Sequence, residues 1–445
     1  MKISVIASII ALLLLALVIP MRFNMVNAAT NVRGIISSDT TWTKSNSPYN
    51  LTGNILVDSG VTLTIEADTI VNFNGYYVRV NGSLEIQPGV ILNFKSAVGI
   101  QVNGVITTRG TSNNPIYVNG IAYYYAWIAP SSYSSIIFSQ SSIGWNEQTG
   151  SGCIIENVIF NSTNIEIHSS PRITSNTFVN SSSITVYGGS PIISKNIING
   201  RISINGGSPT ISNNRIKNGQ IFYYSDQFED HITIIGNVIS GSSAGIRLLG
   251  GSVGGYVLIE QNLIANNDVG IEIFNPNTDD LKILLTIQKN TIINNAIGIH
   301  LENRYSPTII NNNIYNNSVN IKLSGHASKD INATYNWWGT TEIQAISQSI
   351  IDFEEDFNLG KVVYVPFLTN PDAEAPTATY IPQLDSPTPP PGQEPPPNQE
   401  PQQTASVEKI LALALILTAI CAFLGLLIYL VKTRNNNEEI PKPLK

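Results

Sequence analysis

The sequence predicts an all-β protein, a right-handed parallel β-helix solenoid with end caps, followed by a C-terminal transmembrane helix. The first observation is an asparagine that recurs every 18 to 28 residues through the middle of the chain. The second is a large apolar residue two positions after each asparagine, and the third is an alternating apolar run that follows. Self-similarity at this period is typical of a solenoid. The recurring asparagines are Asn157, Asn176, Asn196, Asn214, Asn237, Asn262, Asn290, Asn312 and Asn336.

The period and the residue types favour stacked strands. Period-2 alternation marks a strand with one buried face, and the buried positions are mostly Ile and Val, which favour strands. A turn of about 22 residues at ~3.3 Å each gives a path of about 70 Å, enough for three short strands and their corners. The asparagines are then expected to form a hydrogen-bonded ladder between coils ~4.8 Å apart. A leucine-rich repeat has a similar period, but its Leu-x-x-Leu-x-Leu pattern is missing before these asparagines.

Residues 1–29 predict a secretory signal peptide. A lysine at the second position precedes an apolar run from Ile3 to Ile19, and the segment ends in the small residues Ala28 and Ala29. Cleavage is expected near these two alanines. An uncleaved N-terminal anchor is the alternative.

Residues 30–370 are the expected solenoid ectodomain. Residues 30–56 are expected to cap its N-terminal end, because a solenoid must cover its open core and Trp42 and Tyr49 can do so. In this prediction the coils begin at Ile55.

Residues 337–368 are expected to cap the C-terminal end of the ectodomain. Ile343, Ile346 and Ile350 share one face of a predicted helix. The segment Lys361 to Leu368 predicts a final strand.

The chain beyond residue 370 is expected to anchor the ectodomain to the membrane. Residues 371–408 are rich in proline and indicate an extended spacer. Residues 409–431 predict a transmembrane helix, because Ile410 to Val431 are predominantly apolar and carry no charge. Residues 432–445 contain lysine and arginine and are expected to be a cytoplasmic tail. This order predicts a type I single-pass protein of the cell membrane with an extracellular ectodomain.

The composition excludes some partners and cross-links. Only 12% of the residues are charged and the net charge is −7, which is no electrostatic footprint for a nucleic acid. Of the two cysteines, Cys153 is alone in the expected ectodomain and Cys421 lies in the expected span. No intramolecular disulfide is therefore expected in the extracellular part, and its stability must come from the stacked core and the ladder.

Three segments carry a resemblance to a known family: GVTLTIEADTIVNF (60–73), GSGCIIENVIF (150–160) and NATYNWWGTT (332–341). The chain resembles the right-handed parallel β-helix repeat proteins, the pectate-lyase-like group that also includes polygalacturonases. Within that group the segments are most similar to prokaryotic cell-surface proteins, many of them archaeal. The resemblance spans about residues 30–370. It implies the fold, and it implies no single activity because this fold hosts many functions.

The strongest candidate ligand-binding residues lie in one expected column. In the second strand of each coil, the residue between two buried aliphatics points outward. At four consecutive coils this residue is Arg247, Glu272, His300 and Lys322. Such a line of side chains at ~4.8 Å steps suits an extended polymer, although alternating charge that keeps a sheet soluble is the alternative.

Two further groups are candidate sites. An aromatic stretch within 121–152 interrupts the coils, and its Tyr124 and Trp127 are candidates for stacking on sugar rings. Asp226, Glu229 and Asp230 form a dense acidic group whose oxygens can hold Ca²⁺, the one cofactor considered. A solvated acidic loop is the alternative for this group. The histidines His168 and His326 are interpreted as polar turn surface.

These observations favour a non-catalytic, membrane-anchored surface protein that binds glycans, mediates adhesion or builds the cell envelope. Its expected partners are the cell membrane and polysaccharides or other surface proteins. The motif set of polygalacturonases is missing: the Arg-x-Lys at Arg215 precedes the acidic pair at Asp279, and no Gly-His-Gly occurs. A polysaccharide lyase or glycoside hydrolase is the alternative function, and a metal-maturation accessory protein is a third.

Overall fold

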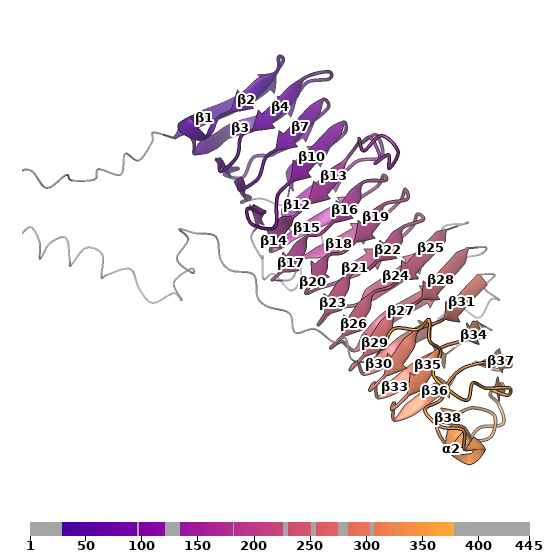
Figure 1. The fold of residues 1–445 in the computed structure, drawn as a ribbon. Coiled ribbons are helices and arrows are strands. Elements are labelled where there is room, and N and C mark those ends of the chain that lie inside the picture. The colour runs from indigo at the N-terminus through magenta and orange to yellow at the C-terminus, as the bar shows by residue number, and fades with distance from the viewer. Residues whose placement is uncertain are drawn as a thin grey trace, which may run out of the picture. The chain divides into compact units, whose positions relative to one another are not determined.

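The computed structural model describes residues 29–377, except for 96–97, 121–133, 181, 226–229, 251–254, 275–283, 303–306 and 326. The described residues belong to the first of two compact units, Met1–Asp385; the second unit is Ser386–Lys445. In the first unit, strands from successive coils stack side by side from β1 to β38 (Figure 1). The predicted all-β class is confirmed for the described residues, which form long parallel sheets.

One sheet has a single column of strands. Each of its strands pairs in parallel with the equivalent strand of the next coil. Among the described residues its 14 strands are β2 (Thr40–Trp42), β4 (Thr62–Ile65), β7 (Ser83–Ile86), β10 (Val105–Arg109), β13 (Ile154–Glu156), β16 (Arg172–Thr174), β19 (Ile192–Ser194), β22 (Thr210–Ser212), β25 (His231–Ile235), β28 (Tyr256–Glu260), β31 (Leu284–Gln288), β34 (Thr308–Ile310), β37 (Ile331–Asn332) and β39 (Val362–Val363).

The second sheet, with 25 described strands, contains two columns that follow each other in every coil. We call the first the short column: β5 (Ile70–Asn72), β8 (Ile91–Asn93), β11 (Ile116–Asn119), β14 (Val158–Asn161), β17 (Thr177–Val179), β20 (Ile197–Ile198), β23 (Arg215–Lys217), β26 (Val238–Ser240), β29 (Leu263–Ala265), β32 (Thr291–Ile293) and β35 (Asn313–Tyr315).

We call the second the long column: β6 (Val78–Val80), β9 (Val98–Val102), β12 (Ser134–Phe138), β15 (Thr163–Ile167), β18 (Ser183–Val186), β21 (Ile202–Ile204), β24 (Ile221–Ser225), β27 (Ala244–Gly250), β30 (Val269–Phe274), β33 (Ile297–Glu302), β36 (Val319–Leu323) and β38 (Ile350–Ile351). Strands β1 (Thr30–Ile36) and β3 (Tyr49–Val57) complete this sheet, and β3 pairs with both β5 and β6. Each coil therefore has three strands, as its length predicts.

The core fills the space between the three columns. Alternate residues of each strand point inward, so β18 buries Ile184 and Val186 and leaves Ser183 and Thr185 on the outer side. The inward side chains form one hydrophobic cluster that continues from Trp42 to Val362. Because most inward residues are β-branched Ile and Val, they fit a pleated surface and pack on the same residue type one coil away.

An asparagine ladder lies at the corner between the single-column sheet and the short column. The backbone N–H and the Nδ2 amide of each asparagine donate to Oδ1 of the next one; for Asn290 both reach Asn312 Oδ1 at 2.9 Å. The Asn290 Oδ1 in turn accepts both donors of Asn262 at 2.9 Å. The ladder comprises Asn176, Asn196, Asn214, Asn237, Asn262, Asn290, Asn312 and Asn336. All eight are buried, and each is paired, so the corner leaves none of these amides unsatisfied.

Asn157 does not belong to this ladder, although the sequence period predicts it. The Oδ1 of Asn176 accepts the backbone N–H of Val158 at 2.9 Å, so Val158 occupies the ladder position in that coil. Asn157 stands one residue earlier and has a φ of 52°. The residue before each ladder asparagine has the same left-handed conformation. Asparagine tolerates that conformation, so an asparagine can stand at this position as well as at the ladder position. The sequence period therefore selected Asn157 although it lies one residue before the ladder position. As a result Phe160, and not Ile159, points into the core.

A second, shorter ladder lies at the corner between the short and long columns and was not predicted. Asn267 donates its backbone N–H and its Nδ2 amide to Asn295 Oδ1 at 2.9 and 3.1 Å. Asn295 makes the same two bonds to Asn317 Oδ1 at 2.9 and 3.0 Å. In these coils both corners are therefore held by stacked amides, and the long column begins at a defined residue.

The N-terminal end differs from the predicted cap. Residues 30–56 form strands that pair with the following coil, so the coils begin at Thr30 and not at Ile55. Trp42 and Tyr49 are buried and stacked, with ring centroids 5.0 Å apart. They belong to the core as side chains of the first coil.

The C-terminal end contains a shorter helix than predicted. Helix α2 (Ile343–Gln348) buries Ile346 but leaves Ile343 60% exposed, and Ile350 belongs to strand β38. The predicted strand Lys361 to Leu368 is reduced to β39. A single 3-10 turn, η1 (Lys44–Asn46), is the other helical element of the described residues.

The expected signal peptide 1–29 lies almost entirely outside the described residues, and the expected transmembrane helix 409–431 and tail 432–445 lie wholly outside them. Within the described part of the chain, no helix is long and apolar enough to cross a membrane. Residues 371–377, expected to begin the spacer, are described and contact the coils.

Replacing Asn290 with Ala should lower the free energy of unfolding by about 1–3 kcal/mol, because Asn262 and Asn312 then lose buried hydrogen-bond partners. Chemical denaturation measures this change. The control is Asn205→Ala, an outward asparagine after β21, which should change the free energy by less than ~0.5 kcal/mol. Equal effects of the two substitutions would contradict a stabilising ladder.

Candidate functional site

The four charged residues predicted to share a column do share one. Arg247 on β27, Glu272 on β30, His300 on β33 and Lys322 on β36 are direct neighbours in the parallel register. All four are half-buried on the outward side of the long column, which we call the long-column face. Phe222 on β24 precedes Arg247 in the same column.

Contacts between neighbouring coils couple these side chains. Arg247 Nε forms an ion pair with Glu272 Oε2. His300 Nδ1 lies 3.9 Å from Glu272 Oε1, and His300 Nε2 is hydrogen-bonded to Ser324 Oγ at 2.9 Å. Glu272 therefore stands between a guanidinium and an imidazole, and its side chain is only 18% exposed.

The charge of His300 follows from these surroundings. The pKa of its imidazole lies below the ordinary value of 6.5 because the ring is largely buried and because Lys322 lies nearby. Glu272 and Glu302 act in the opposite direction but do not outweigh burial. At neutral pH the ring is therefore uncharged and able to accept a proton.

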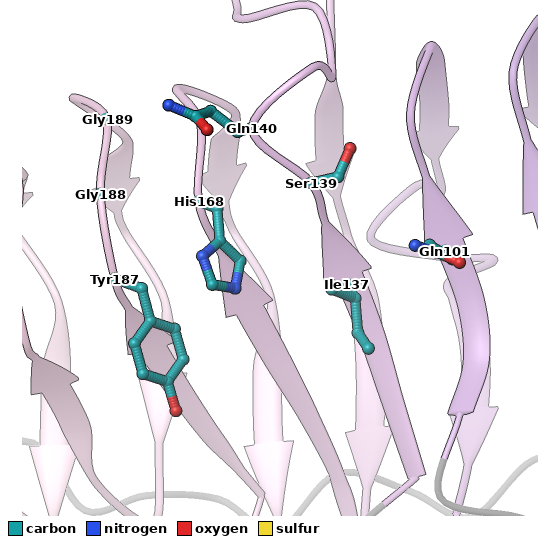
Figure 2. A pocket seen from close by; sticks show the side chains of 8 residues that line it. All are labelled: Gln101, Ile137, Ser139, Gln140, His168, Tyr187, Gly188 and Gly189. Carbon is teal, nitrogen blue, oxygen red and sulfur yellow. The ribbon is translucent and has the colours of Figure 1, made fainter.

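A groove of about 450 Å³ lies on the same face, in the coils of β9, β12, β15 and β18. Figure 2 shows Tyr187 and His168 side by side on neighbouring strands, with Ile137 and Gln101 on the strands beyond them. The rings of His168 and Tyr187 are stacked, with centroids 4.9 Å apart and planes within 9°. Tyr187 is 46% exposed, so part of the stack is open to solvent.

Polar groups surround the stacked pair. Gln101, Ser139 and Gln140 line the groove and offer amide and hydroxyl groups. Burial, and secondarily Glu166, raises the pKa of Tyr187, so its hydroxyl stays protonated at neutral pH and can donate a hydrogen bond. The groove thus combines a flat apolar surface with neutral hydrogen-bonding groups.

Of the predicted calcium group, only Asp230 belongs to the described residues. Asp226 and Glu229 lie outside the described residues. Asp230 is buried; its Oδ1 accepts the backbone N–H of Gly207 at 2.9 Å and its Oδ2 accepts the hydroxyl of Tyr223 at 3.4 Å. No group of three or more His, Cys, Asp or Glu among the described residues is arranged to hold a metal ion. Tyr124 and Trp127 also lie outside the described residues.

Comparison with known proteins bears on the fold. Residues 193–337 match the family model described as right handed beta helix region. With the long parallel sheets, this match decides the architecture. Residues 193–337 form a right-handed β-helix region. No curated protein and no solved structure matches the chain significantly. The matched part of the β-helix contains the charged column, whereas the groove of His168 and Tyr187 lies in the coils before it.

Sequence reasoning missed His168 and Tyr187, because it interpreted His168 as turn surface. Both residues come directly after the last buried aliphatic of a long-column strand, Ile167 or Val186. Tyr224, Leu249 and Phe274 occupy the same position in later coils of the β-helix. When the repeats are aligned, these positions form a second outward column that is rich in aromatic and apolar residues, and this pattern could have identified the two residues.

The low pKa of His300 predicts a pH-dependent loss of stability. The unfolded chain takes up the proton at the ordinary pKa, whereas the folded β-helix does so only at lower pH. The free energy of unfolding should therefore fall as the pH is lowered from about 7 to about 5, and His300→Gln should weaken this dependence. His231→Gln, at an exposed histidine, is the control and should leave it intact. Identical pH profiles for His300→Gln and the parent chain would contradict the assignment.

Proposed function

We propose that this chain is a membrane-anchored extracellular protein that binds glycans on its long-column face without catalysing their cleavage. The described residues contain a β-helix domain, a fold that binding proteins and carbohydrate-active enzymes share. The groove of His168 and Tyr187 carries the proposal. It supplies what a sugar ring requires, a flat aromatic surface edged by amides and hydroxyls.

The size and openness of the groove fit this ligand class. Its volume of about 450 Å³ is within the range of small-molecule sites. Its walls are side chains of successive strands spaced ~4.8 Å apart, so a polymer can continue from coil to coil beyond the groove. The charged column offers Arg247 and Lys322 on the same face for hydrogen bonds to hydroxyl or carboxylate groups of such a polymer.

The membrane anchor and the extracellular location are the part of the proposal that the sequence supports. The apolar segment 409–431 and the proline-rich stretch before it have the composition of a span and a spacer. The partners of the protein are then the cell membrane and an extracellular polysaccharide, or other surface proteins that carry glycans.

Removal of the exposed ring tests the proposal. The full-length chain in detergent is screened on a glycan array, and Tyr187→Ala should weaken binding to the recognised glycan about tenfold, the loss expected for ~1.4 kcal/mol of stacking and burial. Tyr76→Ala, at another exposed tyrosine, is the matched control and should bind as the parent chain does. If no glycan is bound, or if both variants bind equally, the proposal is wrong.

A polysaccharide lyase or glycoside hydrolase is the second candidate, favoured by the carboxylate of Glu272 beside a neutral His300. A carboxylate in contact with an imidazole supplies the two group types that general acid–base catalysis uses. For this candidate, the full-length chain should release new reducing ends from the glycan it binds, and Glu272→Gln should abolish the release. If the glycan is bound but no reducing ends form, the protein is a binding protein.

A further inference from the structure

A small hydrophobic cluster lies on the outside of the coil wall. Leu263, Ala265 and Ile293 occupy outward positions of the short column, yet each is at most 3% exposed. They are separate from the main core, and the half-buried Val238 and Tyr315 pack against them. An outward apolar residue is buried only when something covers it.

Residues 371–377, which we call the strap, lie across the neighbouring strands. The Asn313 amide exchanges two hydrogen bonds with the backbone of Asp372: Nδ2 donates to the carbonyl at 3.2 Å, and Oδ1 accepts the N–H at 2.7 Å. Thr291 Oγ1 donates to the carbonyl oxygen of Pro376. Between these contacts Ala375 is buried. The outward side chains of β35 and β32 thus bind the peptide backbone of the strap.

Charge complementarity adds to these contacts. Lys289 Nζ lies 2.7 Å from Glu374 Oε2 and 3.7 Å from Glu260 Oε1. Gln261 Nε2 donates to the carbonyl oxygen of Glu374 at 3.4 Å. Residues of three coils therefore contact Asp372, Glu374 and Pro376 of the strap.

The strap runs toward the N-terminal coils. Asp372 contacts β35, and Pro376 contacts β32, one coil earlier. The outward column that it follows continues beyond the cluster. Leu263 is paired with Val238 in the preceding coil, Val238 with Arg215, and Arg215 with Ile197. Val238 and Ile197 are half-buried apolar residues. Arginine carries an aliphatic stem that can line an apolar groove.

We propose that residues 378–385, the continuation of the strap, dock along Val238, Arg215 and Ile197. We choose this segment because it directly follows the strap in the chain. The described residues end at Thr377, beside this column. Eight extended residues span at most about 29 Å, or about six coils at ~4.8 Å, which reaches Ile197. The segment ATYIPQLD carries apolar side chains at Tyr380, Ile381 and Leu384 for the column.

Hydrogen–deuterium exchange of the full-length chain in detergent tests this docking. Peptides that cover 378–385 should exchange at least tenfold more slowly than an unstructured chain. Val238→Asp places a charge on the column, so it should restore fast exchange in 378–385. Slow exchange of the peptides around Asn290 shows that the variant still folds.

Thr233→Asp is the matched control, because Thr233 is an outward strand residue of the single-column sheet. It should leave the exchange of 378–385 slow. Fast exchange of this segment in the parent chain overturns the proposal. Slow exchange that disappears on dilution of the protein also overturns it, because a second copy is then the occupant.

Discussion

The fold depends on one interaction, the stacking of buried asparagine amides at the corner between the single-column sheet and the short column. The corner turns the chain sharply, and its amide groups have no access to water. Each asparagine between Asn176 and Asn336 accepts two hydrogen bonds from the coil before it and donates two to the coil after it. An unpaired amide there would cost the desolvation of a buried polar group, so each coil fixes the position of the next. In the coils from Asn176 to Asn336, the register of the long column, and with it the charged column, follows from this corner.

Parallel stacking determines which surface chemistry is possible. Side chains at equivalent positions lie ~4.8 Å apart, close enough for charges on successive coils to interact and for rings to stack. Arg247, Glu272 and His300 are coupled in this way, although they are 25 or more residues apart in the chain. His168 and Tyr187 form their stacked pair by the same means. The face is therefore a linear array, which suits an extended ligand better than a compact one.

The strap shows that the coil wall has a second recognition surface. Asn313 and Thr291 bind peptide backbone, Lys289 binds a carboxylate, and an apolar cluster lies between them. Lys289 lies at the ladder corner, and the other side chains lie on the short column, on a different strand of the coil from the long-column face. The charged column and the strap thus use separate surfaces of the same coils, whereas the groove of His168 and Tyr187 lies in earlier coils.

The repeat and its alternation determined the fold class, the three strands of each coil and the charged column, because burial in a stacked sheet depends on local period-2 pattern. They also identified eight ladder asparagines. Asn157 was assigned wrongly because asparagine suits both the ladder and the left-handed residue before it, and only the hydrogen bond from Val158 to Asn176 separates the two. The groove at His168 and the contacts of the strap with Asn313 and Thr291 were decided by tertiary structure alone. Each joins residues of different coils, or of a coil and the distant chain, and the pattern within one repeat does not encode which outward side chains become covered.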